Sequence, residues 1–232
     1  MSVAIAHAAE AERLGYLRRV LALTFVGLSV AGVVGVVSAV MFAMFSFMLT
    51  GFVPMVIILG CWAVSNFVAQ PMVFSRAKWA GFALGTVTQG VAMGFLLLVA
   101  ASVSAAFIGN PLALITIALG LTGFSGLGMA AYCWGVRRDF SMLGAGLSAV
   151  GLPMLILMGV SFAFPGWFGG TLGIVMSAAF VLVSAGGLLY QLDRVMHDFT
   201  TDMHVEGAYT ITMGLLVLFW NILSLLMRLT RR

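Results

Sequence analysis

The stretch AAFVLVSAGGLLYQLDRVMH, residues 178–197, decides the fold class of this chain. It is apolar and uncharged until Asp193, after which ionisable side chains follow closely. This order is typical of a helix that crosses a bilayer and emerges into water, because a crossing needs roughly 20 apolar residues and charges are costly in lipid. The stretch therefore predicts a transmembrane helix that leaves the membrane near Arg194.

The composition of the whole chain agrees with this prediction. Of its 232 residues, 62% are hydrophobic and 8% are charged, whereas soluble domains have about 25% charged residues. Because lipid leaves every backbone polar group to be satisfied within its own segment, we expect an all-α integral membrane protein, a seven-transmembrane-helix bundle. The seven predicted spans are Val20–Phe47, Phe52–Val73, Trp79–Phe107, Pro111–Gly135, Ser141–Phe162, Gly169–Met196 and Ala208–Leu229. Residues 1–19 and 230–232 would be tails of the single transmembrane domain 20–229.

The charges predict an orientation. Basic residues lie in the N-terminal tail and in alternate predicted loops, namely Arg13, Arg18, Arg19, Arg76, Lys78, Arg137, Arg138 and Arg194. The other loops (LTG, IGN and PGWFGG) carry no charge. The positive-inside rule therefore puts the N-terminus in the cytoplasm, and seven crossings put the C-terminus on the opposite side of the membrane. The charged first 19 residues resemble no cleavable signal peptide, so the first apolar run is expected to remain as a span.

The C-terminus is the exception to this orientation, because it ends in Arg228, Arg231 and Arg232. Either this basic cluster is tolerated outside, or the last segment enters the membrane and returns. We favour a full crossing, since Ala208–Leu229 is long enough to span.

Small residues recur at four-residue spacing in several predicted spans. They are Gly27, Ala31, Gly35, Ala39 and Ala43 in the first, Gly81, Gly85, Gly90 and Gly94 in the third, and Ala118, Thr122, Gly126 and Ala130 in the fourth. Such stripes let helix backbones approach closely in lipid. We therefore expect a tight bundle, with a kink at Pro153 in the fifth span.

No ionisable residue lies in the middle of a predicted span, which argues against several functional classes. A retinal protein needs a lysine in its last span, whereas Lys78, the only lysine, lies in a loop. A coupled carrier would normally keep a carboxylate at mid-membrane. The GFSG stretch, 123–126, resembles the G-x-S-G motif of rhomboid proteases, but no histidine lies at mid-membrane to act as its base. We interpret it as helix packing and expect no enzyme activity.

Polar side chains give two further candidate groups. The sixth-to-seventh loop contains Asp193, His197, Asp198, Asp202, His204 and Glu206. These types can bind a divalent cation or respond to pH, but their spacing matches no defined metal loop, so we expect a solvated linker with no metal and no cofactor. The uncharged polar residues within spans are Asn66, Gln70, Thr86, Thr88, Gln89, Gln191 and Asn221. Most are expected to hydrogen-bond between helices. The pI of about 9.6 reflects arginines at membrane edges, so the expected partner is the lipid bilayer and not nucleic acid.

Three stretches together resemble the Bax inhibitor-1 family, also called the transmembrane Bax inhibitor motif proteins. They are AYCWGVRRDFSMLGAGL (131–147), AAFVLVSAGGLLYQLDRVMH (178–197) and LLVLFWNILSLLMRL (215–229). The residues that carry the resemblance are the loop motif Arg137, Arg138, Asp139 and Ser141, then Tyr190 and Gln191, and then Trp220 and Asn221. The resemblance implies a seven-helix fold in which the last helix is central and the other six surround it.

Some members of this family are pH-sensitive calcium-leak proteins, an activity tied to a pair of aspartates. The resemblance places these two positions at Gln191 and Leu218. Two facing carboxylates can share a proton and titrate as a coupled pair, whereas a glutamine and a leucine cannot. The resemblance therefore does not imply the usual calcium-leak mechanism here.

The bacterial branch that this chain looks most like is the inner-membrane modulator of the AAA protease FtsH. That resemblance implies binding to the protease complex and restraint of membrane-protein degradation, with the short N-terminal tail as a handle for the protease. The alternative is a cation (calcium) leak channel that lacks the aspartate pair and conducts along a polar path past Gln191 and Asn221.

Overall fold

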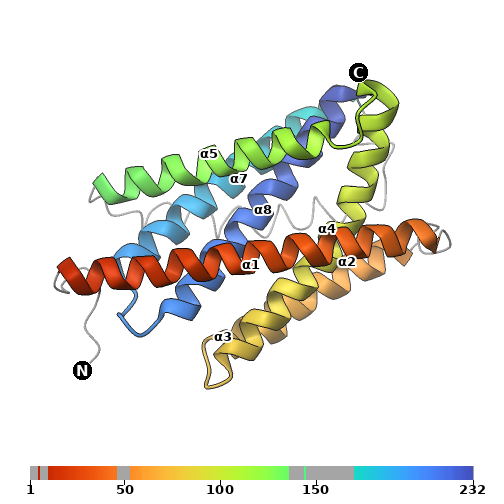
Figure 1. Cartoon of the computed structure of the whole chain (residues 1–232). Coiled ribbons are helices and arrows are strands. Elements are labelled where there is room, and N and C mark those ends of the chain that lie inside the picture. Colours follow the sequence, from red (N-terminus) through yellow and green to blue (C-terminus); the bar gives the residue numbers. More distant parts are fainter. Residues whose placement is uncertain (1–4, 6–9, 46–52, 136–143, 145–169, 232) are drawn as a thin grey trace. The chain divides into compact units, whose positions relative to one another are not determined.

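The computed structural model describes residues 5, 10–45, 53–135, 144 and 170–231 (Figure 1). Its elements are all helical. They are α1 (Glu10–Met44), α2 (Val53–Ala63), the π-helix η3 (Val64–Ala69), α3 (Gln70–Val73), α4 (Lys78–Ile108), α5 (Ala113–Gly135), α7 (Gly170–His197) and α8 (His204–Thr230).

Six segments of the described chain are long and apolar enough to cross a membrane. They are Ala11–Met44, Val53–Val73, Lys78–Ile108, Ala113–Cys133, Gly170–His197 and His204–Thr230. The chain is therefore an all-helical, multi-pass membrane protein, as its composition predicts. The predicted count of seven is not matched, because the described residues contain six such helices. The predicted span Ser141–Phe162 and the kink at Pro153 lie outside the described residues, apart from Gly144.

Helix α1 begins at Glu10, well before the predicted boundary at Val20. Its 35 residues correspond to about 50 Å at 1.5 Å per residue, which exceeds the ~30 Å of hydrocarbon in a bilayer. Tyr16, Leu17 and Val20 are buried at helical spacing. Part of the segment expected to be a tail is therefore a helix that packs against the rest of the protein.

The chain divides into two compact units. Unit 1 comprises Met1–Val99 and Arg194–Leu216, and unit 2 comprises Ala100–Asp193 and Val217–Arg232. Helices α4, α7 and α8 each contribute to both units.

In unit 1, α1 and α4 pack through their small residues. A Cβ added at Gly90 would lie 2.8 Å from the backbone oxygen of Ala31, and one at Gly94 would lie 2.5 Å from Cβ of Ser38. Only glycine permits backbones to approach this closely. The small-residue stripes predicted in the first and third spans are thus confirmed as a helix–helix contact.

The second span of unit 1 contains a π-helical turn that the sequence did not lead us to expect. In η3 the backbone N–H of Gln70 donates to the oxygen of Ser65, five residues earlier. Pro71 follows immediately and has no N–H to donate, and its ring is incompatible with a regular helical carbonyl four residues before it. A wider turn relieves both problems. The helices α2, η3 and α3 form one arm of a hairpin, and α4 forms the other arm after a short turn (Figure 1).

In unit 2, a buried serine connects the end of α4 to the start of α5. The hydroxyl of Ser104 donates to the oxygen of Asn110 and accepts the N–H of Leu114 at 3.3 Å. The side chain of Asn110 accepts the N–H of Leu112 at 3.0 Å, so the chain is capped as it enters α5. Ala118 and Thr122 of the predicted small-residue stripe in α5 are buried.

Candidate functional site

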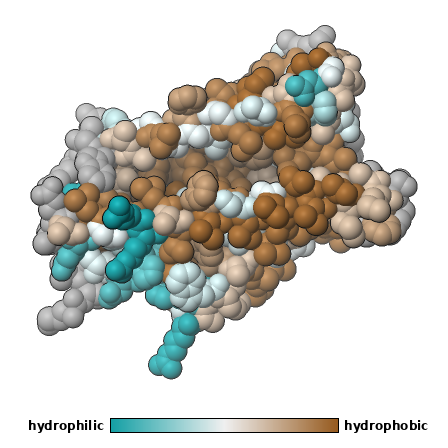
Figure 2. Space-filling model, viewed as in Figure 1, coloured by the Kyte–Doolittle hydropathy of each residue, from teal (hydrophilic) through white to brown (hydrophobic). Residues whose placement is uncertain are grey.

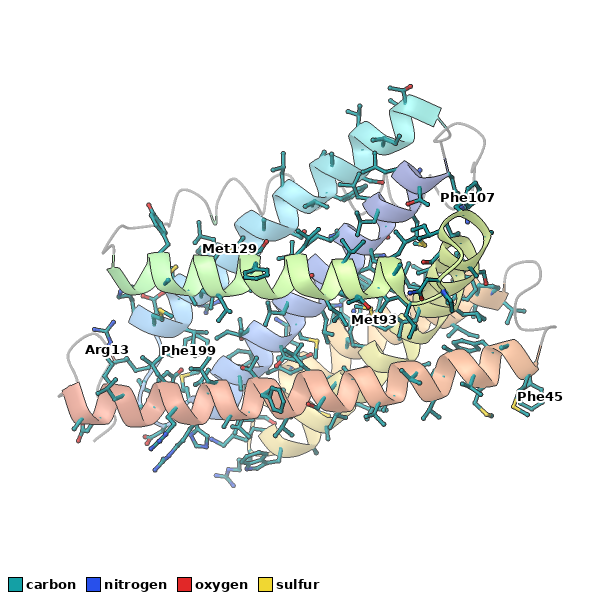
Figure 3. The ribbon with its side chains drawn as sticks, turned by 45° about the horizontal axis from the view of Figure 1, so that its top comes forward. Arg13, Phe45, Met93, Phe107, Met129 and Phe199 are labelled. Atoms are coloured by element: carbon teal, nitrogen blue, oxygen red, sulfur yellow. The ribbon has the colours of Figure 1, made fainter. Side chains whose placement is uncertain are left out.

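The polar end of unit 1 is built around the connection between α7 and α8. The backbone N–H of Ile5, which is fully buried, donates to the oxygen of Phe199 at 3.0 Å. The Phe199 ring lies 5.6 Å below the guanidinium of Arg194 and 6.4 Å, edge to face, from the ring of Phe74. Figure 3 shows Arg13 and Phe199 at the same end of this unit, with Phe45 at the other end of α1. Three separate parts of the chain thus meet at Phe199.

An ion pair between a partly exposed lysine and a buried glutamate links α4 to α8 at this end. Nζ of Lys78 lies 3.6 Å from Oε1 of Glu206 and donates to the backbone oxygen of Asp202 at 3.4 Å. Glu206 is only 7% exposed, and its second oxygen, Oε2, is buried without a hydrogen-bond partner among the described residues. Its place in the first turn of α8 adds the favourable field of the helix N-terminus. The ammonium of Lys78 therefore provides most of the compensation for a carboxylate held away from water.

Tyr16 fixes α1 to the same end of α8. Its hydroxyl lies over Gly207, where an added Cβ would come within 2.6 Å of the tyrosine oxygen. The hydroxyl also donates a long hydrogen bond of 3.5 Å to the backbone oxygen of Met203. On the other side, the ring of His204 contacts the ring of Trp79 edge to face at 6.4 Å. These contacts make one compact structure from α1, the start of α4 and the start of α8.

The outer surface of this polar end carries charges of both signs. The exposed members are Glu12, Arg18, Arg19, Arg76, Arg194, Asp198 and Asp202. In Figure 2, hydrophilic atoms gather near the start of α1 and the α3–α4 turn, and the adjoining helix surfaces are hydrophobic. Among the described residues, no three His, Cys, Asp or Glu side chains come together as a metal site would require. This surface suits contact with headgroups or with a protein domain outside the membrane.

A second polar group lies deeper in unit 1. The hydroxyl of Tyr209 donates to the backbone oxygen of Ser65 at 3.1 Å, and the Ser65 hydroxyl shares a hydrogen bond of 2.8 Å with Thr88. Tyr209 packs against Gly85, where an added Cβ would lie 2.5 Å from its ring. Thr86 and Thr88 also donate to carbonyls of their own helix. Thr88 thus bonds η3 to α4, as predicted for such residues, whereas the hydroxyl of Thr86 bonds to its own helix; Tyr209 bonds α8 to η3.

In unit 2, two of the three stretches that resemble the Bax inhibitor-1 family come into contact. A Cβ at Gly144 would lie 2.6 Å from the ring of Tyr190, and the thiol of Cys133 lies 3.8 Å from the oxygen of Leu189. Gln191 is partly buried, and its Oε1 is buried with no hydrogen-bond partner among the described residues.

The remaining predicted site residues of unit 2 are on the last part of α8. Leu218, at one of the two positions without an aspartate, is 1% exposed. Trp220 and Asn221 are partly exposed. The loop motif of Arg137, Arg138, Asp139 and Ser141 lies outside the described residues.

Two features of the polar groups were missed by reasoning from the sequence. Glu206 was expected in a solvated linker, but it belongs to α8 and is buried against Lys78. The available signal was the pairing of a lone lysine and a glutamate, each beside the start of an apolar run on the same predicted side. Asp198 and Asp202 are exposed, as a solvated linker requires. Tyr209 was not singled out because a tyrosine near a span end is ordinary at membrane interfaces.

Comparison with known proteins gives consistent matches. The sequence model of the family described as "Inhibitor of apoptosis-promoting Bax1" matches residues 13–231. Mouse protein lifeguard 4 is 32% identical over 100 residues, which are 43% of this chain and 41% of the mouse protein. The Golgi anti-apoptotic protein of vaccinia virus strain Lister is 33% identical over 106 residues, 46% of this chain and 44% of the viral protein. The chain thus spans less than half the length of these curated relatives.

Proposed function

The chain belongs to the family of inhibitors of apoptosis-promoting Bax1, and we propose that it is a non-enzymatic modulator of a membrane-bound AAA protease of the FtsH kind. In this role it binds the protease or its partner complex and restrains the degradation of membrane proteins. The proposal places the protein in a bacterial inner membrane, with the N-terminus in the cytoplasm and the C-terminus in the periplasm. It also includes a seventh span and a central last helix. The burial of α8 supports a central last helix. Half of its most apolar 18-residue stretch is buried inside the protein, compared with 17–39% in the other candidate spans.

The observation that carries the proposal is the contact between the N-terminal region and the α7–α8 connection. Ile5 is buried and bonded to Phe199, and Tyr16 is seated on Gly207. Ile5, held in this way, lies at the polar end that carries the exposed arginines and aspartates. A protease that grips short tails outside the membrane would meet the tail and this surface together. Binding would then depend on the tail being seated on the connection.

Co-purification in gentle detergent tests the proposal. We expect the full-length protein, produced at native level, to retain the membrane AAA protease and to slow its degradation of a membrane substrate. Ile5→Asn should weaken both effects, since the variant places a polar side chain where a buried one packs. Leu14→Asn is the matched control, because Leu14 is exposed near the start of α1. A native protein that neither binds the protease nor changes substrate lifetime would contradict the proposal.

A cation leak is the second candidate function, and one observation favours it. Oε1 of Gln191 is buried in α7 without a hydrogen-bond partner among the described residues, and a buried carbonyl oxygen without a donor can coordinate a passing cation. Proteoliposomes loaded with a calcium dye would report such a flux. For a leak, Gln191→Leu should abolish the flux, whereas an unchanged flux would exclude this path.

A further inference from the structure

The second span of unit 1 has two faces of different character. Its inner face, with Ser65, Ala69 and Val73, is buried. It packs so closely on α4 that a Cβ at Gly81 would lie 2.6 Å from the backbone nitrogen of Val73. The polar groups of this inner face are satisfied, because Ser65 bonds to both Thr88 and Tyr209.

The outer face carries two amide side chains. Asn66 and Gln70 are both exposed, and Phe67 beside them is 71% exposed. The amide nitrogen of Asn66 donates to the oxygen of Trp62 in its own helix at 2.9 Å. An amide has two donor hydrogens and two acceptor lone pairs, and no other described residue bonds to this one. Asn66 therefore presents both a donor and an acceptor away from unit 1.

The depth of Asn66 makes this exposure unfavourable in lipid. The span ends at Val73, next to the polar turn that contains Arg76. At 1.5 Å per residue, Asn66 lies about 10 Å inside that end. A polar group there has no water to bond with, so an interhelical hydrogen bond is its favourable state. Gln70 lies one turn nearer the polar end, on the same side of the helix.

We infer that this outer face binds a second copy of the chain. Two copies inserted in the same direction are related by a two-fold axis along the membrane normal, which brings the same patch of each to the interface. Their second spans then run parallel, so Asn66 and the partner's Asn66 lie at the same depth. An amide is self-complementary, since each side chain can donate to the other and accept from it.

The packing residues around Asn66 fit a helix–helix contact. Leu59 and Phe67 are exposed and provide apolar area beside the amide. The interface therefore combines apolar contact with one polar pair.

Energy transfer between two fluorescently labelled populations of the full-length protein in liposomes tests this inference. We expect transfer that rises with the protein-to-lipid ratio and saturates. Asn66→Leu should raise the dimer dissociation constant about tenfold, which corresponds to an interhelical hydrogen bond in lipid. Asn66→Gln should largely retain association. Ser29→Leu is the matched control, because Ser29 is also an exposed polar residue within a span that bonds to its own helix, but it lies on α1 and not on this outer face.

Disulfide cross-linking provides a second readout that does not depend on the Asn66 variant folding. In a background where Cys61 and Cys133 are replaced by alanine, Phe67→Cys should form a covalent dimer with a mild oxidant. Val30→Cys, which is exposed on α1, should not. Any one of three results would overturn the inference. These are random-level energy transfer for the native protein, equal association of Asn66→Leu and native protein, and equal cross-linking of Phe67→Cys and Val30→Cys. Association with a different membrane protein instead of a second copy would appear as one of these negative results.

Discussion

Helix α4 in unit 1 and helix α5 in unit 2 are both rich in glycine, but their glycines have different surroundings. A Cβ at Gly81, Gly85, Gly90 or Gly94 of α4 would lie 2.5–2.8 Å from an atom of a neighbouring element. A Cβ at Gly120, Gly123 or Gly128 of α5 would meet no described atom within 4 Å. Glycine content therefore does not by itself indicate which helix is closely packed.

The difference follows from what each stripe of small residues faces. Gly90 and Gly94 of α4 face α1 at Ala31 and Ser38, which are themselves small, whereas Gly81 faces Val73 and Gly85 faces the ring of Tyr209. Two matched stripes let backbones touch, and in lipid this contact replaces the hydrophobic drive of a soluble core. In α5 the exposed glycines have no such partner among the described residues, although Ala118 and Thr122 on another side are buried. A stripe of small residues thus predicts close helix packing only when a second helix carries a matching stripe.

The largest effect is expected for Gly94→Leu. The new Cβ would lie 2.5 Å from Cβ of Ser38 and 2.9 Å from the backbone nitrogen of Ala39. Because backbone atoms cannot rotate away as side chains can, α1 and α4 must separate, at a cost of about 3 kcal/mol or more. Thermal unfolding in detergent and the monodisperse yield should both fall sharply.

Gly123→Leu is the control for this prediction. The same side chain is added to a glycine-rich helix, but at a position with no described atom within 4 Å. We expect its melting temperature to stay close to that of the native protein. If the two variants lose equal stability, the contrast between α4 and α5 is wrong.

A smaller loss is expected for Lys78→Met, which removes the cation beside Glu206. The carboxylate would then be buried without its ion pair, at a cost of about 1–3 kcal/mol. The lower part of this range applies because the lysine side chain is 30% exposed. Arg76→Met is the control, since Arg76 is exposed in the same turn. Adding Glu206→Gln to Lys78→Met should recover part of the loss, and a double variant as unstable as the sum of the singles would argue against the pair.

The class of the fold was predictable from the sequence because lipid imposes a simple rule on composition. Uncharged runs of sufficient length can only be helices in a bilayer, and five of the seven predicted spans overlap the described helices closely. The first overlaps too, but its predicted boundary at Val20 marks only where the uncharged run begins. Tyr16 and Leu17 instead give Glu10–Arg19 an apolar face that packs.

The details of the polar groups were less predictable, for a physical reason. Each depends on which residues from distant segments meet, as Lys78 meets Glu206 and Ser65 meets Tyr209. Periodicity within one helix carries no information about these encounters. Pro71 was a local signal of the π-turn, since its missing N–H could be read from the sequence. Whether the Asn66 side chain faces the protein or points outward could be learned only from the structure.

Ser104→Ala tests the polar link in unit 2 and should cost about 1–2 kcal/mol. The serine side chain is fully buried and serves both as donor to Asn110 and as acceptor for Leu114. Its removal leaves a buried N–H at the start of α5 without that partner. Thr116→Val is the control, because Thr116 is exposed and its hydroxyl bonds to the backbone oxygen of Leu112, four residues earlier. Equal melting temperatures for the two variants would show that the α4–α5 turn does not depend on this serine.

The smallest effect is expected for Tyr209→Phe in unit 1, at about 0.5–1 kcal/mol. The variant keeps the ring, which fills the space beside Gly85 and contacts Phe82 at 6.4 Å. It loses only the hydroxyl, and the Ser65 oxygen that accepted this hydrogen bond still accepts the N–H of Gln70. No buried group is therefore left without a partner, unlike in Lys78→Met and Ser104→Ala. A melting curve in detergent measures the difference. A loss as large as that of Gly94→Leu would mean that the Tyr209 hydroxyl, and not the contact of its ring with Gly85, holds α8 in place.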